Sequence, residues 1–267
     1  LRAARTADDR LGEGYALNST ACLLMDAGDP KEARDVVEHA LDCFKDVGDK
    51  TGLMMALTNL SFVLPVLGEP EEALRVSRYA MEVADELDYP RGKANIVNNM
   101  ASAYTTMGDH KMAIHCYVQS DERYAEIGEV ELQATNLHEL GRSYVVTGQY
   151  AKAIRVFRRA ITGFRQVGNR RWQAAVCYDL GNTIAAAGHP KLARAYWQEA
   201  LVEMRQLADP RVDELEGRLA GGGWHNDRAS FTSTRGSIAS WSPVSLAELE
   251  NQTLTPTELT SPTEIPG

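Results

Sequence analysis

The chain has 267 residues, of which 44% are hydrophobic, and its 28 basic and 37 acidic side chains give a formal net charge of −9. The hydrophobic share is sufficient for a buried core, which excludes a wholly disordered chain. The acidic balance leaves no overall positive field, so we expect no direct nucleic-acid partner. Charged residues interrupt every apolar run, and no signal peptide is recognisable. We therefore expect a soluble, cytoplasmic protein without a membrane partner.

The chain begins with Leu1 rather than methionine, and we interpret it as a piece of a longer protein. Its cysteines are scattered without CxxC spacing, which favours buried, reduced thiols over disulfides or a zinc site. They are Cys22, Cys43, Cys116 and Cys177.

Turn residues recur every forty positions, which indicates a repeat array. One series lies at Gly28-Asp29, Gly68-Glu69, Gly108-Asp109, Gly148-Gln149 and Gly188-His189. A second series, half a period later, lies at Gly48-Asp49, Asp88-Tyr89, Gly128-Glu129, Gly168-Asn169 and Ala208-Asp209. Each repeat is therefore predicted to be two helices.

The apolar residues between these turns follow helical spacing, and no strand-like alternation competes with it. The predicted helices span 10–27, 30–46, 50–67, 70–86, 91–107, 110–126, 130–147, 150–166, 170–187 and 190–206. We therefore expect an all-α fold over residues 1–220. It comprises five repeats near 10–47, 50–87, 91–127, 130–167 and 170–207, followed by a short C-terminal helix.

Small residues recur at fixed places within the repeats, where paired helices must approach closely. One series is Ala33, Ala73, Ala113, Ala153 and Ala193, and a second, seven positions later, is Ala40, Ala80, Ser120, Ala160 and Ala200. The first helix of each repeat carries a third series at Ala21, Ser61, Ala101, Gly141 and Gly181.

The residues Leu137, Leu140-Gly141, Tyr144, Ala153 and Phe157 resemble the tetratricopeptide (TPR) pattern. The resemblance implies an α-solenoid of helix-turn-helix repeats that forms a right-handed superhelical arc. The forty-residue period, longer than the usual 34, is similar to that of kinesin light chains and bacterial peptide-pheromone receptors.

The closest resemblance is to the C-terminal TPR arrays of actinobacterial multidomain transcriptional regulators of the antibiotic-regulatory and signal-transducing NTPase classes. It rests on Gly68-Glu69-Pro70-Glu71-Glu72-Ala73-Leu74 and on Trp197-Gln198-Glu199-Ala200-Leu201 with Ala208-Asp209-Pro210-Arg211. In such regulators the array follows a DNA-binding domain and a nucleotide-binding switch, and neither domain is present in this sequence.

Residues 221–267 begin with three glycines and are rich in serine, threonine and proline. We expect a flexible, disordered tail, because such a segment buries too little apolar surface to offset its ordering entropy. Within it, Ser245 to Glu250 has a capping-box start and two leucines, Leu246 and Leu249. This segment is interpreted either as a chance turn or as a short motif that docks on a groove, such as one on this protein itself.

No arrangement of catalytic or metal-binding residues is recognisable. The six histidines form no i, i+4 metal pair, and there is no Walker lysine or dinucleotide fingerprint. We therefore expect no enzymatic activity, no metal and no cofactor.

Polar residues recur on the first helices, whose inner faces line the concave surface of such a solenoid. Asparagine suits peptide capture because its amide pairs with a backbone C=O and N–H together, and arginine suits a carboxylate. The candidate peptide-binding residues are Asn59, Asn95, Asn98, Asn99, His138, Arg142, Tyr178 and Asn182. In kinesin light chains and pheromone receptors, groove asparagines hold peptide backbones, and the resemblance extends here only to Asn59, Asn99 and Asn182. In the fourth repeat, Glu139 stands where an asparagine would continue this series.

The predicted function is a protein- or peptide-binding sensor or interaction arm of a bacterial signalling or transcriptional regulator. One alternative is that the polar residues only solvate the inner face. Another is an architectural module that self-associates or restrains a neighbouring NTPase domain. A third is the helical arm of an enzyme whose catalytic domain lies elsewhere.

Overall fold

The computed structural model describes residues 9–220, and within them the chain is helical throughout. The predicted flexible tail at 221–267, with Leu246 and Leu249, lies outside the described residues. The helices are α2 (Arg10–Ala27), α3 (Pro30–Val47), α4 (Lys50–Val66), α5 (Pro70–Glu86), α6 (Pro90–Thr106), α7 (His110–Ile127), α8 (Val130–Val146), α9 (Tyr150–Gln166), α10 (Arg170–Ala186), α11 (Pro190–Gln206) and α12 (Val212–Leu219).

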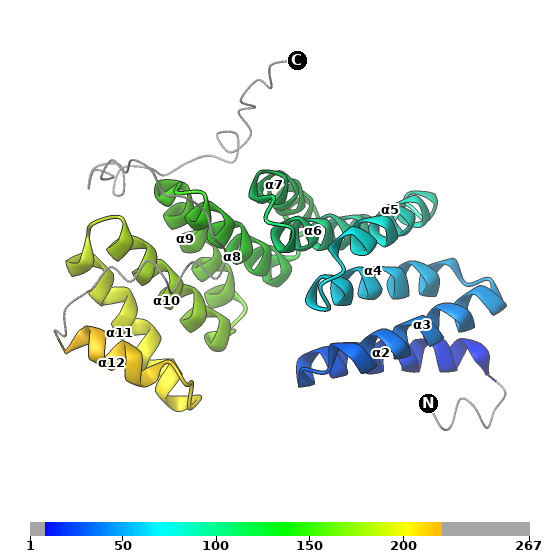
Figure 1. Cartoon of the computed structure of the whole chain (residues 1–267), viewed down its shortest axis with the longest axis horizontal. Coiled ribbons are helices and arrows are strands. Elements are labelled where there is room, and N and C mark those ends of the chain that lie inside the picture. Colours follow the sequence, from blue (N-terminus) through cyan, green and yellow to red (C-terminus); the bar gives the residue numbers. More distant parts are fainter. Residues whose placement is uncertain (1–8, 221–267) are drawn as a thin grey trace, which may run out of the picture. The chain divides into compact units, whose positions relative to one another are not determined.

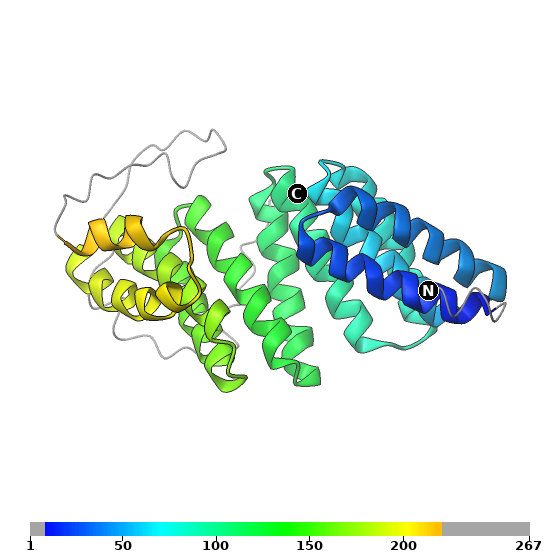
Figure 2. The same cartoon turned by 90° about the horizontal axis from the view of Figure 1, so that it is seen from below.

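The helices form five consecutive hairpins, from α2 with α3 to α10 with α11. The two members of a hairpin are joined by two- or three-residue turns and therefore run antiparallel. Figures 1 and 2 both show α2 beside α3. Every predicted helix boundary agrees with the structure to within one residue, and the predicted short C-terminal helix is α12. The all-α repeat fold is thus confirmed.

The turns between helices depend on a left-handed residue, which closes the preceding helix. Gly28 has φ 83°, and its N–H donates to the carbonyl of Met25 while the next N–H reaches Leu24. This pairing satisfies carbonyl groups at the helix end. Eight turns place glycine at this position, whereas Asp88 (φ 44°) and Ala208 (φ 51°) adopt it without glycine.

The described helices divide into two compact units, α2 to α7 and α8 to α12, with the boundary between Ile127 and Gly128. Within the first unit, the first helices of successive repeats pack directly on one another, α2 on α4 and α4 on α6. Within the second unit, α8 contacts α10, and α12 packs on α11.

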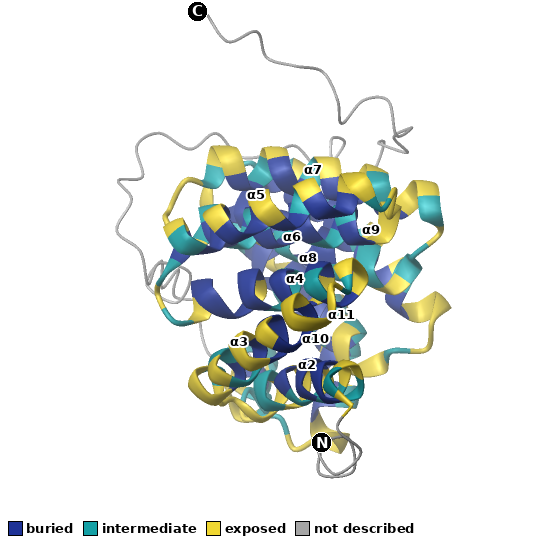
Figure 3. Ribbon diagram, turned by 90° about the vertical axis from the view of Figure 1, so that its right-hand side faces the viewer, coloured by how far each residue is buried: buried dark blue, intermediate teal, exposed yellow. Residues whose placement is uncertain are grey.

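The small-residue positions are buried, as predicted. All five alanines of the first series are completely buried, and Gly141 and Gly181 lie against large aromatic rings. A Cβ atom at Gly141 would lie 2.4 Å from Phe157 Cε1, and one at Gly181 would lie 2.4 Å from Trp197 Cδ1. The glycines of these first helices therefore leave room for aromatic rings from the second helices. Figure 3 shows the buried residues concentrated where helices face one another.

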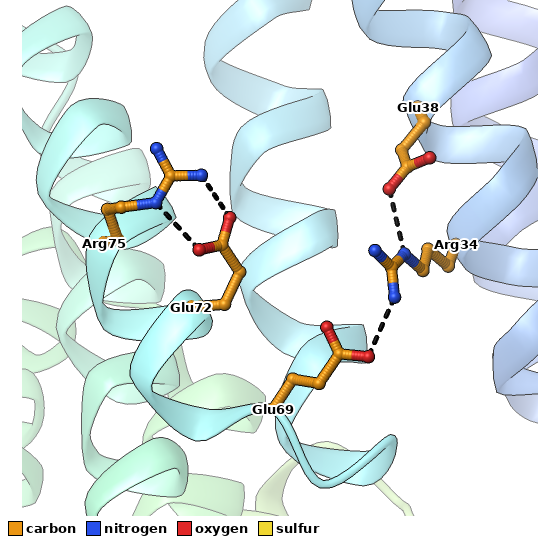
Figure 4. A network of polar contacts seen from close by, with 5 residues as sticks. All are labelled: Arg34, Glu38, Glu69, Glu72 and Arg75. Carbon is orange, nitrogen blue, oxygen red and sulfur yellow. Dashed lines mark hydrogen bonds and ion pairs between the residues drawn. The ribbon is translucent and has the colours of Figure 1, made fainter.

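An ion pair on the surface of the first unit connects two successive repeats. Arg34 on α3 donates to Glu38 on its own helix at 2.9 Å and to Glu69, the residue directly before α5, at 2.8 Å (Figure 4). Glu72 and Arg75 form a separate pair within α5. Exposed pairs of this kind contribute little stability, so the repeats are held mainly by apolar packing.

The cysteines confirm the expectation of buried thiols at three positions and contradict it at one. Cys43, Cys116 and Cys177 are buried, whereas Cys22 is exposed. The reason is the orientation of α2: Cys22 lies forty residues before Phe62, which is also exposed, so both occupy the uncovered face of their first helices.

Candidate functional site

The most distinctive surface in the first unit is an apolar stripe on α4. Met55, Phe62 and Val66 are 37%, 48% and 60% exposed, respectively. Their spacing of seven and four residues places all three on one side of the helix. We call these three residues the α4 stripe. Exposed large apolar side chains that share one helix face are typical of a surface that binds a partner.

Hydrogen bonds on both sides of α4 show which way the stripe faces. Toward α2, Asn59 Nδ2 donates to Asn18 Oδ1 at 2.9 Å. From α6, Asn99 Nδ2 donates to the Thr58 carbonyl at 2.8 Å and to Ser61 Oγ at 2.9 Å. Because the neighbouring first helices lie on either side and α5 packs on the buried side, the α4 stripe faces away from the second helices.

In the first unit, the asparagines predicted to hold a ligand form hydrogen bonds to neighbouring helices. Asn99 is 7% exposed and bonded to α4, and Asn59 is half-buried and bonded to α2. Asn95, also half-buried, accepts a hydrogen bond from Tyr124 at 2.8 Å through its Oδ1. Asn98 is half-buried on the same helix. Their arrangement is therefore a ladder of contacts between neighbouring helices rather than a row of open amides.

The second unit contains a corresponding contact between first helices. His138 on α8 is 4% exposed, and its Nε2 lies 2.8 Å from Asp179 Oδ2 on α10. The rings of Phe157 and Trp172 lie 5.8 and 6.0 Å from the His138 ring. This histidine is thus held inside the unit, and its exposed surface is small.

Arg142 is the one predicted residue of the second unit that the structure places on the surface. Its Nη1 lies 3.3 Å from Glu139 Oε1, one turn earlier on α8. Glu139, which interrupts the asparagine series, is therefore a partner of the arginine that follows it.

Tyr178 and Asn182 lie beneath the C-terminal helix. The Tyr178 hydroxyl donates to the Glu214 carboxylate at 3.1 Å, and Arg211 stacks over the tyrosine ring at 5.0 Å. Asn182 Oδ1 accepts hydrogen bonds from Trp197 Nε1 and from the Arg218 guanidinium. Burial raises the pKa of the Tyr178 hydroxyl. Helix α12 therefore covers the part of α10 that was predicted to contact a ligand.

The three residues of the α4 stripe were not among the candidate peptide-binding residues named from the sequence. A signal for them exists, because α4 carries no charged residue after Lys50 and its apolar residues are not confined to one side. A helix of this type has more apolar surface than its own hairpin can cover.

Family models describe tetratricopeptide repeats at residues 94–126 and at residues 137–171. The first match covers most of α6 and α7, and the second begins within α8 and ends at the start of α10. A comparison with curated protein sequences finds no match.

Several solved structures have similar folds. BtubC from P. vanneervenii is 18% identical with a TM-score of 0.62, and the match covers 91% of this chain and 92% of that one. A Rap protein in complex with competence and sporulation factor is 15% identical with a TM-score of 0.69, covering 82% and 62%. A Signal Transduction ATPase with Numerous Domains from Pyrococcus horikoshii, which has a TPR sensor, is 15% identical with a TM-score of 0.65, covering 80% and 33%.

None of the helices within residues 9–220 combines the length and apolar character needed to cross a bilayer. No three His, Cys, Asp or Glu side chains of this region are grouped so as to hold a metal ion. The repeat-model matches at residues 94–126 and 137–171, together with the five hairpins, show that residues 10–206 are an array of helix-turn-helix repeats of the tetratricopeptide type, a fold that serves as a protein-interaction scaffold.

Proposed function

We propose that this chain is a protein- or peptide-binding module that acts as the sensor or interaction arm of a bacterial signalling or transcriptional regulator. The α4 stripe is the observation that carries the proposal. Three exposed apolar side chains on a first helix would be covered by a partner, and each Å² of apolar surface buried there contributes roughly 25 cal/mol. The activity is binding rather than catalysis.

Polar groups beside the stripe would orient the ligand. Asn59 and Asn95 are half-buried, so their amides are still within reach of a ligand that lies along α4. Separately, within the second unit, the exposed Arg142 is suited to a carboxylate of a partner. The ligand would therefore be an extended or short helical peptide with closely spaced apolar side chains.

The structural neighbours support a regulatory setting. One is a Rap protein in complex with competence and sporulation factor, and another is a signal-transduction ATPase whose repeats are a sensor. Because this chain spans about a third of that ATPase, a neighbouring NTPase domain in the same polypeptide is part of the proposal.

A displayed library of random twelve-residue peptides, selected on the full-length chain, tests the proposal. Selected peptides are then measured by fluorescence polarisation against Phe62→Ser with Val66→Ser, and against Val202→Ser as the matched control. Val202 is 57% exposed on α11, a second helix of the other unit. We expect at least tenfold weaker binding to the double variant and unchanged binding to the control. Failure to enrich any peptide, or equal affinity for wild type and double variant, would contradict the proposal.

Self-association is a second candidate function, favoured by the uneven charge of the two units. Residues 9–127 contain 11 basic and 21 acidic side chains, a formal charge of −10. Residues 128–220 contain 13 basic and 10 acidic side chains, a formal charge of +3. Opposite charges on two copies would attract at low ionic strength. Light scattering at 50 and 500 mM NaCl tests this, since a monomer at both salt concentrations would exclude it.

A further inference from the structure

A groove on the other side of the first unit has a composition unlike its surroundings. It has a volume of about 520 Å³ and lies between α5, α6 and α7. Its apolar lining includes Met81, Val97 and Met100. Its charged lining consists of the basic Arg78, Lys93 and Arg123 and the acidic Glu82 and Asp85, so basic side chains outnumber acidic ones by one. We call this surface the cationic groove. Because second helices contribute two of its three walls, it is separate from the α4 stripe.

Two of the three basic side chains have no carboxylate partner among residues 9–220. Lys93 Nζ lies 3.0 Å from an Asp85 oxygen, so its charge is compensated within the groove. Arg78 donates only to the carbonyl of Leu74, on its own helix. The Nε atom of Arg123 is buried and has no hydrogen-bond partner in the described part of the chain. A guanidinium group inside a partly apolar groove strongly favours an anionic partner.

These two arginines differ from three of the other four arginines of this unit. Arg10, Arg34 and Arg75 all contact carboxylates. The unit has 21 acidic side chains to its 11 basic ones, so acidic partners are plentiful. The groove thus keeps two guanidinium groups available where the surrounding surface is acidic.

Residues 245–250 of this chain have the complementary chemistry. This segment, Ser-Leu-Ala-Glu-Leu-Glu, combines Leu246 and Leu249 with Glu248 and Glu250. From residue 236 to the end, the sequence has four acidic residues and no basic ones. We propose that the cationic groove binds this acidic, leucine-containing segment, from the same molecule or from a second copy.

The pairing follows from the groove's two kinds of lining. In the proposed complex, the glutamates would pair with the guanidinium groups of Arg78 and Arg123, and the leucines would cover the apolar lining formed by Met81, Val97 and Met100.

Attachment of the segment to the protein makes a weak contact sufficient. A tethered ligand acts at an effective concentration that can reach the millimolar range. Occupation of the cationic groove would then depend on salt, because the contact pairs opposite charges near solvent.

The test uses a fluorescein-labelled peptide of residues 243–252 and the full-length chain with Leu246→Ser and Leu249→Ser, so that its own segment does not compete. We expect saturable binding that weakens at least tenfold with Arg78→Gln and Arg123→Gln together. Arg75→Gln is the matched control, because Arg75 is exposed on the same helix and paired with Glu72. It should leave the affinity unchanged. A peptide with Glu248→Gln and Glu250→Gln should bind at least fivefold more weakly.

Two further measurements keep the outcome decisive. Since Arg123 is partly buried, the exposed Arg78→Glu is tested alone and should also weaken binding at least fivefold. The unmodified full-length chain should bind the peptide more weakly than the Leu246→Ser, Leu249→Ser chain, because its own segment competes.

Absence of saturable binding, or equal affinity with and without Arg78, overturns the groove site. Equal affinity of the two receptors overturns the chain's own segment as its occupant. Phe62→Ser with Val66→Ser should change none of these affinities, which separates this result from the proposed function.

Discussion

Asn99 Nδ2 on α6 donates a hydrogen bond of 2.8 Å to the main-chain carbonyl of Thr58, which lies 41 residues earlier on α4, the first helix of the preceding repeat. The same separation joins Asn59 to Asn18 and His138 to Asp179. Each contact links the first helices of neighbouring repeats just beside their inner face. Asn99→Ala therefore tests the folding of the unit, and ligand binding is better tested with exposed residues such as Phe62.

We predict that Asn99→Ala lowers the free energy of unfolding by about 1–3 kcal/mol, because the substitution leaves buried polar groups of α4 without their donor. Urea denaturation followed by circular dichroism measures this. Ser102→Ala, on the same helix and half-buried, is the control and should change stability by less than about 0.5 kcal/mol. Equal effects of the two substitutions would show that the ladder does not stabilise the fold.

Close packing predicts that replacing two helical glycines by alanine has opposite effects on stability. Gly141→Ala places a Cβ atom 2.4 Å from Phe157, and we expect a loss of about 1–3 kcal/mol despite the better helix propensity of alanine. Gly217→Ala, where no atom lies within 4 Å, should be neutral or stabilising by up to about 1 kcal/mol. The midpoints of thermal unfolding compare the two variants, and a stable Gly141→Ala protein would contradict the packing.

The left-handed turn residues predict a stabilising substitution. Ala208 adopts φ 51°, a conformation that costs roughly 1–2 kcal/mol for a residue with a Cβ atom. We expect Ala208→Gly to raise the free energy of unfolding by about 0.5–1 kcal/mol, once the greater freedom of glycine in the unfolded chain is deducted. The reverse change at Gly68 (φ 80°), Gly68→Ala, should lower it by a similar amount. Differential scanning calorimetry measures both.

Thiol accessibility predicts one reactive cysteine among four. Burial raises the pKa of Cys177 to about 12 and that of Cys116 to about 11, and Cys43 is buried as well. Burial raises the pKa of Cys22 as well, so the expected difference in reactivity comes from access, because Cys22 is exposed and the other three thiols are shielded. Titration with a chromogenic disulfide should show one fast thiol, which Cys22→Ser removes, and three that react only after unfolding. More than one fast thiol in the folded protein would contradict the burial pattern.

An ion pair in the connection between α11 and α12 predicts that the stability of the fold depends on pH. Hydrogen bonds from the Arg211 side chain lower the pKa of Asp209 to about 2, below its usual value of 3.8. Because the folded-state pKa is lowered, this carboxylate stabilises the fold above about pH 4, and the contribution disappears as the pH falls toward 2. Asp209→Asn should therefore be less stable than wild type at pH 7, and the difference should shrink as the pH falls through 2. A constant difference across this range would exclude the linkage.

The helices and their pairing were predictable because the information for them is local and repeated. A glycine every forty residues marks a turn, and alanines at fixed offsets such as Ala153 mark the contacts between paired helices. Each feature was available five times, so that single exceptions such as Asp88 did not shift the pattern.

The roles of the polar residues were only partly predictable, because they depend on neighbours far away in the sequence. Whether Asn99 faces a ligand or the next helix depends on how α6 is rotated about its own axis, which its neighbours determine. Tyr178 and Asn182 were placed on the inner face, and only the position of α12 shows that they are covered. For Met55 and Val66, the uncharged sequence of α4 was the available signal, but it equally describes a fully buried helix.

The contacts at the three junctions between first helices use different chemistry. An amide meets an amide between α4 and α2, an amide meets a carbonyl and a hydroxyl between α6 and α4, and an imidazole meets a carboxylate between α8 and α10. The forty-residue blocks are alike in backbone, yet a block moved to another place would bring a polar group opposite the wrong partner. With about 1–3 kcal/mol lost for each buried group left unpaired, the order of the blocks along the chain is itself specified by these junctions.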